Sequence, residues 1–165
     1  VVIPKEIRRT MRIREGDPLE IFTDRDGEVI FKKYSPIGEL SESAGIYCDA
    51  LVKNTQKIVV ICDRDHCIAA GGIPKKEVLE RRITTSLEEI MESRRPFAMT
   101  DTQKPFTALE GVDLPVVVAP PIISSGDILG AVVFLGEESG KTAQPDDVKL
   151  ALVASTFLGK NMEDY

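Results

Sequence analysis

We predict an α+β protein of two domains from three observations. A short basic segment at the front precedes two stretches of strand character, residues 19–23 and 28–33, with an Asp-Gly turn between them. From residue 36 on, the patterns are typical of a helix, two strands, helices, more strands and a last helix. Charge divides at the same place: residues 1–36 hold eight basic and seven acidic side chains, and residues 37–165 hold thirteen and twenty. We expect a β-rich domain at 1–35, a linker helix at 36–54 and an α/β domain at 55–165.

The first fourteen residues predict the end of a short strand, at residues 1–3, followed by one basic helix. Pro4 suits the first helical position because its missing N–H loses no hydrogen bond there. Ile7 and Met11 lie four residues apart and form an apolar face. Five basic residues against one acidic residue give residues 1–14 a charge of +4 in a chain of net charge −6. Because phosphate neutralisation depends on local charge, this segment indicates a polyanion as partner.

The two predicted strands that follow form a hairpin. Asp26-Gly27 is a tight-turn signal, and apolar residues alternate with polar ones on both strands, as in a half-buried ribbon. Two short strands and one helix cannot bury enough apolar surface to fold alone. The segment therefore needs a partner chain, and we expect an obligate dimer or a dimer of dimers.

These residues carry a family resemblance. The string VVIPKEIRRTMRIREGDPLEIF, continued to Lys33, resembles the swapped-hairpin DNA-binding domain of AbrB-type bacterial transition-state regulators. The resemblance implies two hairpins interlocked into a dimer whose surface arginines hold double-stranded DNA. Arg8 and Arg9 match contact positions of the family. Lys5 and Arg12 lie on neighbouring helical turns without a motif match, and they are further candidates for phosphate contacts.

The family's pattern also begins earlier than this sequence does. Its first strand, its leading basic residues and a Gly-Arg pair would lie before Val1. The resemblance, together with the missing initiator Met, therefore implies a further segment of roughly fifteen residues ahead of Val1, long enough for one strand and its turn. A chain beginning at Val1 would lack one strand of each hairpin and would bind DNA less well.

The linker helix has two interpretations. From Ile37, apolar residues recur at intervals of three, four, three and four, which is the seam of a short coiled coil. The same pattern is typical of an amphipathic helix packed on its own domain. Two heptads do not decide between these alternatives. The seam residues are Ile37, Leu40, Ala44, Tyr47 and Leu51.

The remaining chain predicts two hairpins and three helical regions. We expect strands at 58–62 and 67–70, helices at 75–82 and 86–94, and a hairpin across 116–135 that turns at 124–127. Gly130 in its last strand indicates a bulge or a close backbone approach. A last helix at 145–165 has an apolar stripe. That stripe is Val148, Leu152, Ser155, Leu158 and Met162.

This order of elements resembles a GAF domain, a sensor module with a central antiparallel sheet. The strongest likeness is the hairpin at residues 120–133, and the resemblance covers about residues 38–165. GAF domains commonly dimerise through their first and last helices, which would make a dimer or a homotetramer. The irregular residues 97–111 predict either a lid over a ligand cavity, with Thr100, Thr102, Gln103 and Thr107 as polar contacts, or a segment collapsed onto the sheet.

Other motifs favour structural roles. Cys48, Cys62 and Cys67 are an odd set without ligand spacing, and His66 is the only histidine, so we predict buried thiols and no metal site. The string GEESGKT at 136–142 is one residue short of a phosphate loop, and its two glutamates would repel phosphate. No grouping suits nucleophilic or acid–base catalysis, so we expect no catalytic residues and no cofactor. No segment predicts a membrane span or a signal peptide, which favours the cytoplasm.

We therefore predict a homo-oligomeric bacterial DNA-binding transcription regulator, an activator or repressor of sporulation genes, which is not an enzyme. The sporulation role follows from the resemblance alone. A small-molecule effector of the GAF domain is expected if the domain is a sensor, and none if it is a scaffold. One alternative is an antitoxin of the swapped-hairpin fold, against which the apolar residues 57–165 argue. The other is a GAF-type sensor enzyme, for which no acid, base or nucleophile set is visible.

Overall fold

The computed structural model describes residues 1–137 and 141–163, and it divides the chain into two compact units, Val1–Ser35 and Pro36–Tyr165. Each unit is described by itself. The predicted α+β class is confirmed: a hairpin unit precedes a unit built on an antiparallel sheet. Within the described residues, no helix is both long enough and apolar enough to cross a lipid bilayer.

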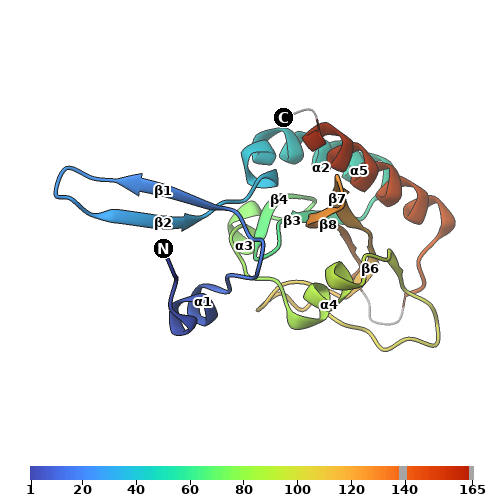
Figure 1. Ribbon diagram of the computed structural model, residues 1–165. Coiled ribbons are helices and arrows are strands. Elements are labelled where there is room, and N and C mark those ends of the chain that lie inside the picture. Colours follow the sequence, from blue (N-terminus) through green and yellow to red (C-terminus); the bar gives the residue numbers. More distant parts are fainter. Residues whose placement is uncertain (138–140, 164–165) are drawn as a thin grey trace. The chain divides into compact units, whose positions relative to one another are not determined.

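The first unit is one short helix and one hairpin (Figure 1). Helix α1 (Lys5–Met11) starts after Pro4, and the two strands pair in register from Leu19 opposite Lys33 to Thr23 opposite Val29. At the turn, Asp24 Oδ1 accepts hydrogen bonds from the backbone N–H groups of Asp26 and Glu28, and Gly27 has a positive φ. Both strands therefore match their predicted positions. They are β1 (Leu19–Thr23) and β2 (Val29–Lys33).

Residues 1–3 are not a strand in this structure, in contrast to the prediction. A strand requires a neighbour for its backbone groups, and both described strands of this unit pair with each other. The unit also leaves large apolar side chains on its surface. Ile21 is 63% exposed and Val29 is 57% exposed, with Phe22 and Ile30 only slightly less so.

The second unit is a six-stranded antiparallel sheet between two layers of helix. Its strands run in the order β4-β3-β8-β6-β5, and β7 extends the line of β6 along β8. The predicted hairpins at residues 58–70 and 116–135 are confirmed. The strands are β3 (Ile58–Cys62), β4 (Cys67–Gly71), β5 (Phe97–Ala98), β6 (Val116–Ala119), β7 (Pro121–Ser124) and β8 (Asp127–Leu135).

Two helices cover one face of this sheet and two cover the other. The short 3-10 turn η1 (Ile37–Leu40), helix α2 (Ser41–Thr55) and helix α5 (Pro145–Glu163) pack on the face that carries Val59, Ile61 and Phe134. Helices α3 (Lys75–Val78) and α4 (Thr85–Ser93) pack on the opposite face, with Val60 and Val133. Figure 1 shows α2 beside α5 and α4 across the sheet. The alternation of neighbouring strand residues between faces is the period of two expected of a strand.

Helix α2 shows which interpretation of the 37–51 pattern fits the structure. Ile37, Ala44 and Leu51 are buried in the core of their own unit, as expected of an amphipathic helix packed on its own domain. Cys48, and not Tyr47, completes this buried face. The buried intervals of three, four, four and three follow the 3.6-residue helical period, so these side chains do not form a coiled-coil seam with another chain.

Helix α5 buries a different face from the predicted stripe. Gly159 faces the sheet, where an added Cβ would lie 2.2 Å from the carbonyl oxygen of Ile123. Such a close approach admits only a small residue at this position, whereas Phe157 is 52% exposed. Ser155 and Leu158 are buried as predicted, but Leu152 is exposed. The buried residues of α5 are Asp147, Ala151, Ala154, Ser155, Leu158 and Gly159.

One further prediction in this unit was wrong, and one pair of alternatives can be compared with the structure. The helix expected at 75–82 ends at Val78, because the backbone of Glu80 and Arg81 bonds to Cys67 at the edge of β4. Residues 97–111 do not stand off the sheet as a lid. Phe97 and Ala98 form β5, Met99 donates to the carbonyl of Val117, and Met99 and Leu109 are buried. Residues 97–99 and 106–109 therefore pack onto the sheet, which fits the second of the two interpretations, while residues 100–105 are exposed.

Gly130 occupies a close approach between strands, as predicted. A Cβ at this position would lie 1.8 Å from the carbonyl oxygen of Cys62, a backbone atom that cannot swing away. Gly45 in α2 is the opposite case, since nothing lies within 4 Å of an added Cβ there.

We predict that Gly130→Ala lowers the free energy of unfolding by about 2 kcal/mol or more, because the sheet must separate to admit the methyl group. Gly45→Ala is the matched control and should raise it by up to about 1 kcal/mol through helix propensity. Urea unfolding followed by far-UV circular dichroism measures both. Equal effects of the two substitutions would contradict the assigned role of Gly130.

Candidate nucleic-acid interface

The four predicted contact residues all belong to α1 or its end. Lys5, Arg8 and Arg9 are exposed, and Arg12 is partly exposed. The Arg9 guanidinium lies 2.7 Å from Glu6 Oε2, in an ion pair whose two side chains are both about three-quarters exposed. A pair this exposed contributes little to stability. It leaves Arg9 accessible to a stronger anion such as phosphate.

Helix α1 ends in a tight cap that involves these arginines. Arg12 has a φ of 55°, in the left-handed region, and its backbone N–H bonds to Arg9 O at 3.3 Å. The N–H of Ile13 bonds to Arg8 O at 2.8 Å. These two bonds satisfy carbonyl groups that a helix end otherwise leaves open. The carbonyls that hold the cap are therefore those of the two arginines that match the family.

One contact of this region was missed by the sequence analysis. Lys33 Nζ donates to the carbonyl oxygen of Arg12 at 3.0 Å, across 21 positions of the chain. The pattern of residues placed Lys33 at the end of a strand, but no local spacing predicts its contact with the helix end. Only the fold of the hairpin unit brings the two residues together.

The cysteines are buried thiols, as predicted. Cys48, Cys62 and Cys67 are free, and Cys62 lies opposite Cys67 across β3 and β4. His66 contacts Asp63 at 3.4 Å and Glu80 at 3.1 Å. Within residues 1–137 and 141–163, no group of three or more His, Cys, Asp and Glu side chains is placed to hold a metal ion. The GEESGKT string lies partly outside the described residues, at 138–140.

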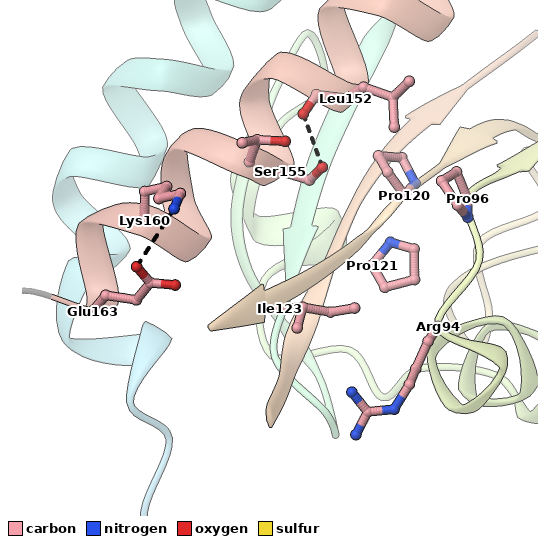
Figure 2. A pocket seen from close by; sticks show the side chains of 10 residues that line it. Arg94, Pro96, Pro120, Pro121, Ile123, Leu152, Ser155, Lys160 and Glu163 are labelled. Carbon is pink, nitrogen blue, oxygen red and sulfur yellow. Dashed lines mark hydrogen bonds and ion pairs between the residues drawn. The ribbon is translucent and has the colours of Figure 1, made fainter. Parts of the chain in front are cut away.

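An open groove of about 250 Å³ lies beside β7, and its lining includes Pro96 but no residue of 97–111. Figure 2 shows three proline rings, Pro96, Pro120 and Pro121, together with Leu152 and Ile123 at its apolar floor. Its rim carries charged side chains. Arg94 donates to the carbonyl of Gly126 at 2.6 Å, and Lys160 pairs with Glu163 at 3.8 Å.

The outer faces of α2 and α5 form an apolar surface, which we call the α2/α5 surface. Tyr47 stacks on Phe157 with ring centroids 5.6 Å apart. Around this pair, Ile46 is 69% exposed and Val153 is 55% exposed. Large apolar side chains gathered on two adjacent helices mark an interaction surface. The α2/α5 surface consists of Ile46, Tyr47, Val153 and Phe157.

The comparisons with known proteins assign the chain to a family. Residues 39–163 match the family described as Stage V sporulation protein T C-terminal, transcription factor. The chain belongs to the stage V sporulation protein T family. Residues 1–38 match the family described as Antidote-toxin recognition MazE, bacterial antitoxin. The chain is thus a transcription factor with an AbrB-type DNA-binding domain followed by a GAF-like domain.

Two relatives and one solved structure agree with this assignment. Stage V sporulation protein T of Bacillus subtilis (strain 168) is 47% identical over 165 residues, which cover 99% of this chain and 91% of that protein. Transition state regulatory protein AbrB of the same organism is 58% identical over 36 residues, 22% of this chain and 36% of that protein. The GAF domain from Acinetobacter phosphoenolpyruvate-protein phosphotransferase has a TM-score of 0.61 at 10% identity, covering 78% of this chain and 89% of that one, which shows the fold alone.

We predict that the buried thiols make the protein less stable in alkali. Burial, with the nearby Cys67 adding to it, raises the pKa of Cys48 from 9.0 to about 12. The hydrogen bond with Cys67 and burial also raise the pKa of Cys62. Above pH 9 the unfolded chain loses thiol protons that the folded chain keeps, so the free energy of unfolding falls as pH rises from about 9 towards 12. Urea unfolding at pH 8 and at several values above 9 measures this slope, which Cys48→Ala should flatten. An equal slope in the variant would contradict the assignment to Cys48.

Proposed function

We propose that residues 1–35 bind double-stranded DNA as a dimer, with Arg8 and Arg9 as the principal contacts from each protomer. The observation that supports this most directly is the exposed arginine pair on a helix whose end is capped through its own carbonyls. Neither guanidinium has to break a buried interaction to reach a phosphate or a base edge. Lys5 and Arg12 add positive charge on the adjoining turns. The GAF-like unit follows from Pro36 and begins with η1 and α2.

The dimer itself is supported by the hairpin. Ile21, Phe22, Val29 and Ile30 are exposed on a two-stranded sheet, which is marginal in water without further cover. A second copy of the hairpin, related by a two-fold axis, would cover these apolar side chains with an identical apolar surface. Two such copies also place two sets of arginines on one duplex, which raises affinity through the second contact.

The GAF-like domain then joins dimers into a tetramer through the α2/α5 surface. Its four apolar side chains lie on one side of two adjacent helices, which suits a self-complementary interface. We assign this domain a scaffold role with no turnover, since Phe97, Phe106 and Leu109 pack into the core on the side of the sheet where a ligand cavity was expected. A small-molecule effector, if the domain binds one, has the β7 groove of Figure 2 as its open site. The protein acts where the DNA is, in the cytoplasm.

We predict that Arg8→Ala with Arg9→Ala weakens DNA binding by the complete protein without changing its melting temperature, because exposed arginines contribute little to folding. Each lost phosphate contact flattens the plot of log affinity against log salt by about one unit. Fluorescence anisotropy at several salt concentrations measures both quantities. Arg25→Ala with Lys32→Ala removes the same charge from exposed positions of the hairpin and is the control. If both double variants lost the same DNA affinity, the total positive charge of the domain would account for binding. That result would rule out Arg8 and Arg9 as specific contacts.

We predict that Phe157→Glu separates the tetramer into dimers, because it buries an unpaired charge at the centre of the α2/α5 surface. The dissociation constant for dimers should rise by about a hundredfold. Sedimentation equilibrium of the complete protein gives the mass. Thr102→Glu makes the same change of charge at an exposed loop position and should leave the mass unchanged. A tetramer that survives Phe157→Glu, or a wild-type protein that never exceeds a dimer, would overturn the scaffold role.

A further inference from the structure

Helix α1 has few means of holding its own position. It has seven residues and buries none of them. A helix this short is marginal in water, since too few backbone bonds offset the cost of its nucleation. The orientation of Arg8 and Arg9 must therefore be fixed by contacts made from outside the helix. The question is which residue of the hairpin unit makes them.

Lys33 makes such a contact. It is the last residue of β2 and pairs with Leu19 at the start of β1. Its ammonium group reaches the carbonyl oxygen of Arg12 at 3.0 Å in a partly buried position. Its neighbour Lys32 is exposed. Because successive strand residues face opposite sides, Lys32 does not share the environment of Lys33.

The acceptor of this bond is the cap residue of α1. Arg12 is held in the left-handed region while Arg12 N–H and Ile13 N–H bond to the carbonyls of Arg9 and Arg8. A hydrogen bond from a charged donor is about twice as strong as a neutral one. Lys33 thus ties the hairpin to Arg12, and the cap ties Arg12 to the backbone of both contact arginines.

We infer that Lys33 is a positioning residue of the DNA-binding site, which acts through Arg8 and Arg9 and does not contact DNA itself. This inference rests on the proposed role of these arginines. If the end of the helix is already fixed in the free protein, less conformational entropy is lost when DNA binds. Lys33 would then raise affinity beyond the single positive charge that it adds to the domain.

The experiment compares Lys33→Met with Lys32→Met in the complete protein. Both remove one charge and keep an apolar stem of similar length. Affinity is measured on labelled double-stranded DNA selected on the wild-type protein, with and without Arg8→Ala and Arg9→Ala. We expect Lys33→Met to lose about tenfold more affinity than Lys32→Met. In the double-alanine background this excess should vanish, because interacting residues are not additive.

Amide hydrogen exchange without DNA gives an independent readout. The N–H groups of Arg12 and Ile13 should exchange faster in Lys33→Met than in the wild-type protein. In Lys32→Met their exchange rates should equal those of the wild-type protein. Equal affinity losses for the two variants would overturn the inference. So would an excess that persists in the double-alanine background, since Lys33 would then contact DNA directly. If Lys33→Met does not assemble, Lys33→Gln and Lys32→Gln are compared by the same criteria.

The two proposals fail in different ways. If Arg8→Ala with Arg9→Ala leaves affinity and salt slope unchanged, the placement of the DNA contacts is wrong. Unchanged amide exchange at Ile13 in Lys33→Met shows instead that Lys33 does not hold the cap, whatever the arginines do.

Discussion

No side chain among residues 1–35 is buried within the chain. This constraint governs the rest of the molecule, because a unit without a core cannot be stable by its own contacts. Its hairpin strands expose Ile21 and Val29, and its helix rests on a cap and on the bond from Lys33. The proposed dimer would complete this unit. In such a dimer, folding, dimerisation and the presentation of the arginines would be one equilibrium, and protein concentration would enter all three.

The GAF-like unit meets the opposite condition. Its sheet is covered on both faces, and α5 approaches so closely that Gly159 has no room for a side chain beside Ile123. Apart from Leu158, the residues of α5 that are buried against the sheet are small or polar, while Leu152, Val153 and Phe157 are exposed. An exposed Phe157 stacked on Tyr47 is thus a consequence of close packing on the other side of the helix. The order of small and large residues along α5 thus produces both close packing on the sheet and the apolar α2/α5 surface.

The close packing of α5 on the sheet also explains which elements of the fold could be predicted from the sequence. The strands β3 and β8 are short, nearly continuous apolar runs next to turn residues, and β1 ends at an Asp-Gly turn. These strands and the close approach at Gly130 could therefore be located from local pattern. Helix faces were harder. The apolar pattern placed Leu152 on the buried face of α5. Which face is buried depends on how closely the helix packs against the sheet, and the local sequence does not give that distance. Likewise, the sequence placed Tyr47 on the apolar face of α2, but Cys48 is the residue that is buried. This shift by one position is the difference between the 3.5-residue period of a coiled coil and the 3.6-residue period of a packed helix.

For the candidate DNA site, the sequence predicted Arg8 and Arg9 as contacts, but it did not predict the bond from Lys33 to the carbonyl of Arg12. Arg8 and Arg9 belong to a string that matches a family, whereas Lys33 gains its role from a contact 21 positions away. Local pattern also left residues 97–111 open between a lid and a packed segment. That outcome depends on whether Met99 and Leu109 find room in the core, and both do. Contacts that span distant residues are decided by the assembled fold.

The connection between the two units limits how they can influence each other. Tyr34 N–H bonds to the carbonyl of Pro18 within the hairpin unit, and Ile37 is fully buried in the GAF-like unit. Only Ser35 and Pro36 lie between these two anchored residues, and proline restricts its own φ and the conformation of the residue before it. A change in assembly at the α2/α5 surface would reach the DNA-binding dimer through a connection this short. Any such coupling is reciprocal, so DNA that favours one spacing of the hairpin dimers must also favour the matching state of the GAF-like domains.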